Sequence, residues 1–189
     1  MGPTARPATE RLWALPGFAG TLGTGMAFSD ATFNHRRIAM PNPKSTAQLA
    51  GHPIHPMLIP FPIAGFVGTF LVDIALKSSG DEFWYRMGLW LLGVALIFAA
   101  LAAVAGLIDV MGDVQIRNLN DAWLHAGGNV AAVLLELINF YLRYREGASS
   151  AAGIGFWLSL FTVLILLFTG WKGWEMVYKH HVGVSDVRQ

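Results

Sequence analysis

The chain contains no cysteine, and charged residues make up only 13% of its 189 residues. Without thiols it can form no disulfide bond, thiolate metal site, iron–sulfur cluster or covalent c-type haem attachment. Any cofactor must therefore be held by histidine, carboxylate, methionine or backbone groups. The net charge is +1, and no basic patch interleaved with aromatic residues occurs, which argues against nucleic acid as a partner. No nucleophile has an acid–base partner at a readable spacing, which favours an electron carrier over an enzyme.

Long apolar runs, in contrast, are abundant. Hydrophobic residues make up 54% of the chain and gather in four blocks, at about residues 57–76, 87–108, 122–142 and 151–171. A helix of about 20 residues spans the hydrocarbon core of a bilayer, and small residues inside the blocks favour close helix packing. The sequence therefore predicts an all-α, integral membrane four-helix bundle over residues 51–184.

The two ends of the chain differ from the blocks. Residues 1–50 are rich in proline, glycine, threonine and alanine without sustained periodicity, which predicts an N-terminal extension that is largely disordered or surface-lying. Met26 and Met40 are candidate alternative starts. Residues 185–189 are expected to form a C-terminal tail. Lysine and arginine are slightly more numerous on the side of the two termini, which favours cytoplasmic termini in a bacterial inner membrane.

Histidines far apart in the sequence are predicted to meet at one end of the bundle. If the helices alternate in direction, both termini and the 109–121 loop lie on one side of the membrane. The histidines beside the blocks all fall there: His52, His55, His125 and His180. Asp109 ends the second block on the same side, and Asn129 follows one turn into the third. We interpret the histidines as cofactor ligands and these two residues as partners that orient an imidazole. Helix ends also contact water, so the alternative is that the histidines lie at the membrane–water interface without a cofactor.

The stretch GHPIHPMLIPFP, residues 51–62, supports a shared site for the first two histidines. Pro53 favours extended backbone before it, and a polyproline-like run has three residues per turn. His52 and His55 would then point to the same side. In the alternative interpretation, the prolines shape only the entry turn and the histidines bind loop carbonyls.

The third block carries a polar stripe at helical spacing. His125, Asn129, Glu136 and Arg143 fall near one meridian of a helix, with Asn139 beside them. Ionisable groups inside a membrane are costly, so they are taken as functional and as facing the bundle interior. Glu136, the deepest, is assigned to the surroundings of the cofactor. It could instead be a neutral carboxyl hydrogen-bonded between helices, a partner of Arg143, or part of a proton path for transport with Asp109.

Two cofactors suit imidazoles that meet in a membrane bundle without sulfur. Haem b can be held between facing helices by axial histidines. A non-haem metal such as zinc, iron or copper, bound by histidine and aspartate, is the other, and the sequence does not decide which metal. The predicted function is membrane electron transfer, with the lipid bilayer, a redox partner protein and further copies of the chain as compatible partners. The alternative is a cofactor-free membrane anchor or assembly protein that docks a partner.

Several motifs carry a family resemblance. GHPIHPMLIPFPIAGF, GLID ending at Asp109, AWLHAGGN, INFYLR and GWKGWEMVYKHHVGV occur in this order. Over residues 51–184 the chain resembles the bacterial predicted membrane-protein family known as domain of unknown function 2231. The resemblance implies a four-helix inner-membrane domain, sometimes found near redox partners such as Rieske-type modules. It implies no activity.

Overall fold

The computed structural model describes residues 41–185, and the structural statements below concern that part of the chain. The chain divides into two units, Met1–Ala39 and Met40–Gln189. The predictions for residues 1–40, including the candidate starts at Met26 and Met40, lie outside the described residues, as do residues 186–189 of the predicted tail.

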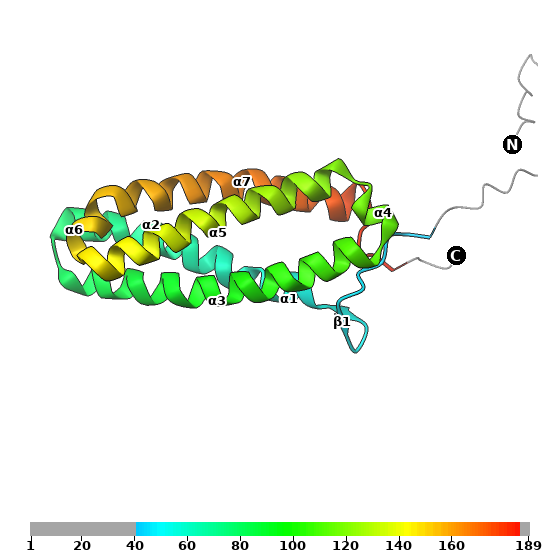
Figure 1. Cartoon of the computed structure of the whole chain (residues 1–189), viewed down its shortest axis with the longest axis horizontal. Coiled ribbons are helices and arrows are strands. Elements are labelled where there is room, and N and C mark those ends of the chain that lie inside the picture. Colours follow the sequence, from blue (N-terminus) through cyan, green and yellow to red (C-terminus); the bar gives the residue numbers. More distant parts are fainter. Residues whose placement is uncertain (1–40, 186–189) are drawn as a thin grey trace, which may run out of the picture. The chain divides into compact units, whose positions relative to one another are not determined.

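The described chain is mostly helical (Figure 1). Two short strands, β1 (Gln48–Leu49) and β2 (His52–Pro53), pair antiparallel, with Leu49 opposite His52. The helices follow in this order: α1 (Ile54–Leu58), α2 (Pro60–Ser79), α3 (Glu82–Gly112), α4 (Val114–Arg117), α5 (Asn120–Glu146), α6 (Ala148–Ser150), the π-helical turn η2 (Ala151–Gly155) and α7 (Phe156–Tyr178).

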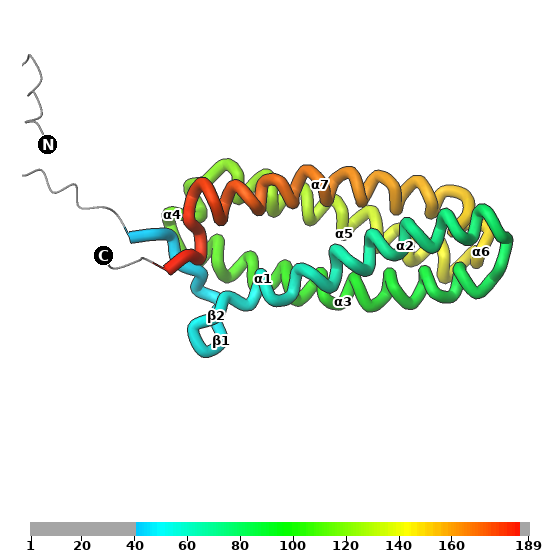
Figure 2. The backbone as a smooth tube through the Cα atoms, turned by 180° about the vertical axis from the view of Figure 1, so that it is seen from behind, coloured from blue at the N-terminus to red at the C-terminus, as the bar shows by residue number. Residues whose placement is uncertain are grey.

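The four long helices lie side by side, and each of the four apolar blocks falls within one of them or its continuation. Helix α2 packs mainly on α3 and α5 mainly on α7, while α2 also contacts α7 and α3 contacts α5. Both views show α4 and the β1–β2 hairpin at one end, here called the terminal end, and α6 at the other, here called the α6 end (Figures 1 and 2).

Three segments are long and apolar enough to cross a membrane: Ile54–Ser79, Glu82–Gly112 and Ala148–Tyr178. Helix α5 is not among them, because the polar stripe of the third block lowers its hydropathy. A fourth membrane crossing by α5 stays a prediction.

Local sequence explains where the long helices begin and end. Pro60 occupies the start of α2, where its missing N–H costs nothing. Helix α2 ends at Gly80, whose φ of 70° is left-handed and therefore suits glycine. Asp81 then caps α3 by accepting a hydrogen bond from the Phe83 amide at 2.9 Å. Pro60 thus lies at a position of the first apolar block where a helix tolerates proline.

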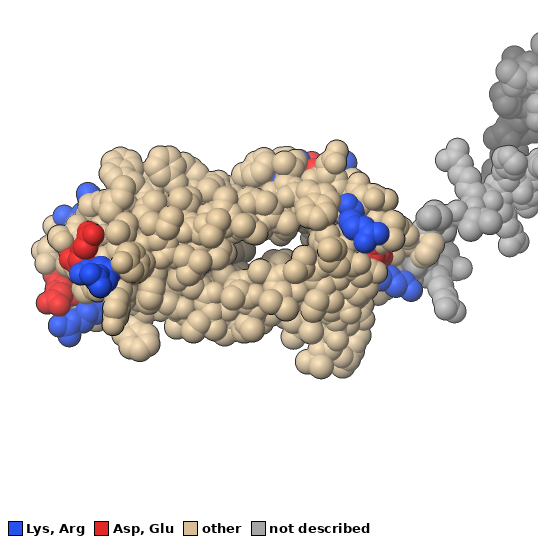
Figure 3. All heavy atoms as spheres, in the orientation of Figure 1, with Lys and Arg blue, Asp and Glu red and all other residues tan. Residues whose placement is uncertain are grey.

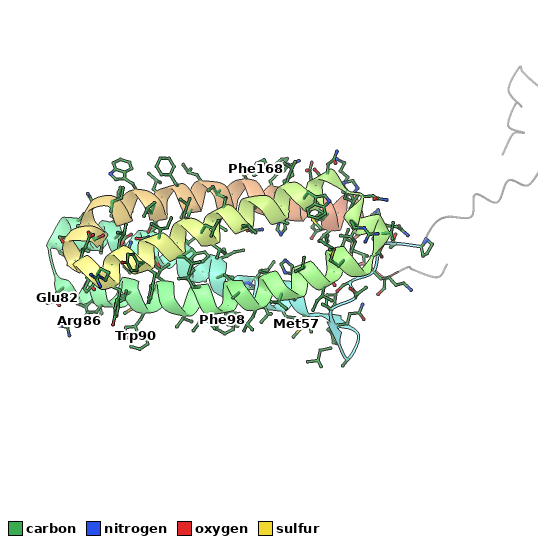
Figure 4. The ribbon with its side chains drawn as sticks, in the orientation of Figure 1. Met57, Glu82, Arg86, Trp90, Phe98 and Phe168 are labelled. Carbon is green, nitrogen blue, oxygen red and sulfur yellow. The ribbon has the colours of Figure 1, made fainter. Side chains whose placement is uncertain are left out.

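The interior is formed by small residues on α3 and by larger ones around them. Phe66 and Leu92 are the large members of the buried core, which Ala95 and Ala99 complete. Large apolar side chains such as Met57, Trp90, Phe98 and Phe168 point away from the helices (Figure 4), and Trp90 is 75% exposed. On the face shown in Figure 3, charged side chains gather at the two ends and leave the middle uncharged. This distribution suits a lipid environment.

Candidate functional site

Two histidine side chains contact each other between the helices, toward the terminal end. The ring centroids of His55, on α1, and His125, on α5, lie 6.1 Å apart, with their planes at 80°. Nδ1 of His55 lies 2.8 Å from the carbonyl oxygen of Ala102 on α3, and Nδ1 of His125 lies 2.8 Å from that of Thr169 on α7. A carbonyl only accepts, so in each neutral ring the proton is assigned to Nδ1 and the lone pair to Nε2.

A glycine faces each imidazole. A Cβ atom added at Gly106 would lie 3.1 Å from Nδ1 of His55, and one added at Gly173 would lie 3.1 Å from Cε1 of His125. Both distances are shorter than ordinary van der Waals contact. The two glycines therefore provide the space that the rings occupy.

Asn129 lies one turn after His125 and contacts it, as the spacing in the third block indicates. Its Nδ2 donates to Nε2 of His125 at 3.1 Å and to the His125 carbonyl at 2.9 Å. Its Oδ1 accepts from the Thr169 hydroxyl at 3.1 Å. We call His55, His125, Asn129 and Thr169 the imidazole cluster. That Asn129 orients a cofactor ligand stays a prediction.

The extended geometry expected for the first two histidines holds only as far as Pro53. That residue has φ −60° and ψ 126°, but it is the N-cap of α1, so His55 is already helical. His52 lies on β2 and is exposed. The prediction that His52 and His55 face one site is corrected, because proline favours the start of a helix as readily as the continuation of an extended run.

His180 binds a carboxylate at the start of α5 instead of joining the two imidazoles. Its Nε2 lies 2.9 Å from Oδ2 of Asp121, and Lys172 Nζ donates to Oδ1 of the same carboxylate at 3.0 Å. The hydrogen bonds from His180 and Lys172 lower the pKa of Asp121 from 3.8 to about 2. Among residues 41–185, His55 and His125 are the histidines whose rings contact each other.

Asp109 holds the segment that precedes β1 against α3, and within residues 41–185 its carboxylate bonds to that segment rather than to an imidazole. Its Oδ1 accepts from the Ser45 hydroxyl at 2.9 Å, the Thr46 amide at 2.7 Å and the Ala47 amide at 2.7 Å. The segment that follows α7 joins this contact, since the Gly183 amide donates to the carbonyl of residue 43 at 2.8 Å. The end of the predicted extension is therefore packed at the terminal end.

The C-terminal part of the polar stripe, Glu136, Asn139 and Arg143, forms a separate site toward the α6 end. Arg143 pairs with Asp73 of α2 through two hydrogen bonds, Nη1 to Oδ1 at 2.7 Å and Nη2 to Oδ2 at 2.5 Å. Ser159 of α7 donates to Oδ2 of Asp73 at 2.9 Å and accepts from Nη2 of Arg143 at 3.1 Å. All three side chains are buried.

Asn139 connects this ion pair to Glu136. Its Oδ1 accepts from Nε of Arg143 at 2.8 Å, and its Nδ2 donates to Oε2 of Glu136 at 2.8 Å. We call Asp73, Glu136, Asn139, Arg143 and Ser159 the ion-pair cluster. Glu136 is eleven residues beyond His125, about 16 Å along the helix axis. It therefore belongs to this cluster and not to the surroundings of the imidazoles.

Two members of the ion-pair cluster were not predicted. Asp73 is the single charged residue of the first apolar block, and a lone carboxylate in such a block is itself a signal for a buried partner. Ser159 gave no signal, since a serine in an apolar helix is common. Side chains that bind one another from different helices have no regular spacing in the sequence, so their contact could not be predicted from periodicity.

The two imidazole rings are more exposed than the charged side chains of the ion-pair cluster. Figure 3 shows an opening between the α3 and α5 sides of the molecule, in the half toward the terminal end. His55 and His125 are partly exposed, whereas Asp73, Glu136 and Arg143 are at most 1% exposed. Among residues 41–185, no group of three or more His, Asp or Glu side chains is placed to hold a metal ion.

Comparison with known proteins identifies one family. A family model described as "Predicted membrane protein (DUF2231)" matches residues 51–186. No curated protein and no solved structure matches the chain. The resemblance inferred from the sequence motifs is confirmed over nearly the same residues.

Proposed function

Since the chain belongs to the predicted membrane-protein family DUF2231, we propose that it binds haem b between His55 and His125 and carries electrons within the membrane. The observation that carries this proposal is the pair of imidazoles, 6.1 Å apart between helices. His55 and His125 would supply the two imidazoles that hold the haem iron, and their rings lie close enough together to share one ion.

The number of ligands favours haem over a non-haem metal. Haem iron takes its equatorial ligands from the porphyrin and needs only two axial side chains. Zinc and similar ions take three or four protein ligands, and the described residues hold no group of three His, Asp or Glu side chains suited to a metal. A pair of histidines therefore provides enough ligands for haem, but too few for a non-haem metal.

The hydrogen bonds of the imidazoles also support ligation. In each ring the Nδ1–carbonyl bond places the proton on Nδ1 and the lone pair on Nε2, the arrangement typical of metal-bound histidine. The Asn129 amide now donates to Nε2 of His125, and ligation requires that bond to be given up. Asn129 would keep its bonds to the His125 carbonyl and the Thr169 hydroxyl. When bound, the haem would supply one-electron chemistry, and the residues of the imidazole cluster would hold and orient its ligands.

The visible absorption spectrum of the purified full-length protein tests this proposal. The protein, extracted in mild detergent, is expected to show a Soret band that shifts on reduction, and metal analysis should find iron. His55→Ala and His125→Ala should each abolish the band while the protein remains in the membrane fraction. His52→Ala and His181→Ala are matched controls, because both side chains are exposed, and they should retain the full band.

Three outcomes would overturn the haem assignment. A colourless protein with stoichiometric zinc or iron would transfer the proposal to a non-haem metal. A colourless protein without metal, even after incubation with haem, would leave the cofactor-free anchor. A band that survives in both His55→Ala and His125→Ala would place any haem elsewhere.

The proposal includes the topology that the sequence favours. Helix α5 would be the fourth membrane crossing, and both termini would lie in the cytoplasm of a bacterium whose inner membrane holds the protein. The lysine and arginine excess on the terminal side supports this orientation. An alkaline phosphatase fused at residue 80 should be active, and an inactive fusion would reverse the orientation. A redox partner protein, and any further copies of the chain, would bind the protein in this membrane-embedded form.

A further inference from the structure

The ion-pair cluster holds two carboxyl groups but one cation. Both oxygens of Asp73 are bound by Arg143, and Oδ2 also accepts from Ser159. Arg143 directs its Nε–H to Asn139 and has no hydrogen bond to Glu136. From α3, the Tyr85 hydroxyl donates to the Arg143 carbonyl at 2.9 Å and does not reach the carboxyl groups. The charge of Arg143 is thus matched by Asp73 alone.

Glu136 is left with one unsatisfied oxygen. The residue is fully buried, with 0% exposure, and its Oε2 accepts from Asn139. Its Oε1 has no hydrogen-bond partner, and neither has the buried Oγ1 of Thr162 on α7. The Thr162 hydroxyl lies near enough to interact with the Glu136 carboxyl, although outside hydrogen-bond geometry. Two unpartnered oxygens therefore lie close together across the α5–α7 interface.

Protonation of Glu136 removes a negative charge that no cation of the cluster balances. An ionised Glu136 could accept a hydrogen bond from the Thr162 hydroxyl, but it would add a second negative charge near Asp73 without a cation of its own, which is costly in an apolar interior. A neutral carboxyl carries one O–H donor, and a threonine hydroxyl can accept it. We propose that Glu136 is a proton-binding site inside the protein, with the proton on Oε1 and shared with Thr162 Oγ1. Asn139 holds the other oxygen.

This site is independent of the imidazole cluster. Glu136 lies about 16 Å along α5 from His125, and its hydrogen bonds lead to Asn139 and, through it, to the ion pair. The ligand of the site is a single proton exchanged with water. Its uptake or release changes the charge of the buried cluster by one while the Asp73–Arg143 pair stays in place.

Infrared spectroscopy of the full-length protein tests the proposal. At neutral pH the protein should show the carbonyl stretching band of an un-ionised carboxyl group, and this band should shift in heavy water as the proton exchanges. Glu136→Gln should remove the band, whereas Glu146→Gln should keep it, because Glu146 is an exposed glutamate on the same helix. Thr162→Val should move the band to higher frequency by removing the acceptor, and Thr162→Ser should leave it nearly unchanged.

Isotope labelling assigns the band without a substitution, so the test does not depend on the folding of a variant. Labelling of all glutamates with carbon-13 should lower the band frequency, and labelling of all aspartates should not. Absence of the band at neutral pH, or its survival in Glu136→Gln, would overturn the proposal. A shift on aspartate labelling would place the proton on an aspartate and overturn it as well.

Discussion

The ion-pair cluster and the imidazole cluster both use polar side chains of α5, but different partners satisfy them. In the ion-pair cluster, side chains from α2, α5 and α7 bind one another, and Asp73, Glu136 and Arg143 are at most 1% exposed. In the imidazole cluster, His55 and His125 are held mainly through backbone carbonyls of α3 and α7 and are partly exposed.

This difference supports a structural role for the ion-pair cluster. Side chains that bind one another in a closed interior stabilise one arrangement of helices, because loss of any partner leaves a buried polar group unsatisfied. In the imidazole cluster, backbone carbonyls fix both rings at Nδ1, and Nε2 of His125 accepts from the Asn129 amide. The ion-pair cluster therefore joins α2, α5 and α7, and the imidazole cluster is the site that we propose for haem.

The largest expected effect comes from breaking the ion pair. Arg143→Met would leave the Asp73 carboxylate buried without its cation, and removal of one partner from a buried pair costs about 3–5 kcal/mol. We expect this loss in the free energy of unfolding, measured in detergent by circular dichroism against denaturant. The imidazole cluster offers no comparable effect, since His125→Ala removes a carbonyl hydrogen bond of about 1 kcal/mol.

Two controls define the interpretation. Arg145→Met changes an exposed arginine on the same helix and should alter stability by at most about 0.5 kcal/mol. The double variant Asp73→Leu/Arg143→Met should be more stable than Arg143→Met alone, because it removes both charges together. An Arg143→Met variant within about 1 kcal/mol of the unchanged protein would contradict the structural role of the pair.

The helices could be predicted from the sequence better than their ends. Apolar runs fix where helices must lie, and every predicted block falls within a long helix or its continuation. The ends depend on single capping residues, so α3 begins at Glu82, after the Asp81 cap, and not near Met87. The start of α1 at Ile54 was missed because Pro53 is compatible with both an extended run and a helix start.

The site could be predicted only where its residues share a helix. The contact between His125 and Asn129 follows from a separation of four residues on α5. The ring contact between His55 and His125 and the pairing of Asp73 with Arg143 join residues about 70 positions apart, so they depend on how helices pack. The bond between His180 and Asp121 was not predicted for the same reason, because nothing local in the sequence marks Asp121 as a partner of His180.

A smaller effect should separate the glycine that faces an imidazole from a neighbouring glycine of the same helix. A Cβ atom added at Gly170 would have no other atom within 4 Å, whereas one added at Gly173 would meet His125 at 3.1 Å. Alanine at an open helical position stabilises by up to about 1 kcal/mol relative to glycine. Gly170→Ala should therefore be more stable than the unchanged protein, and Gly173→Ala should not.

The same pair of variants tests the proposed haem site. Gly173→Ala should shift the visible spectrum of the loaded protein, since the His125 ring must move by a few tenths of an ångström to make room. Gly170→Ala should leave the spectrum unchanged. Equal stability gains and unchanged spectra in both variants would show that His125 is not packed against Gly173.

The smallest effect is expected at the terminal end, where Asp121 binds His180 and Lys172. The pKa of Asp121 is lowered from 3.8 to about 2, chiefly by the hydrogen bond from His180. A carboxyl group with a lowered pKa in the folded state stabilises the protein above the unfolded pKa, and this contribution is lost as the pH falls toward the folded pKa. The difference in unfolding free energy between the unchanged protein and Asp121→Asn should thus be constant above about pH 5 and shrink between pH 4 and pH 2. Because the Asp121 side chain is still 15% exposed, added salt should reduce the difference at neutral pH. A difference that stays constant down to pH 2 would mean that the Asp121 carboxylate does not stabilise the fold through its charge.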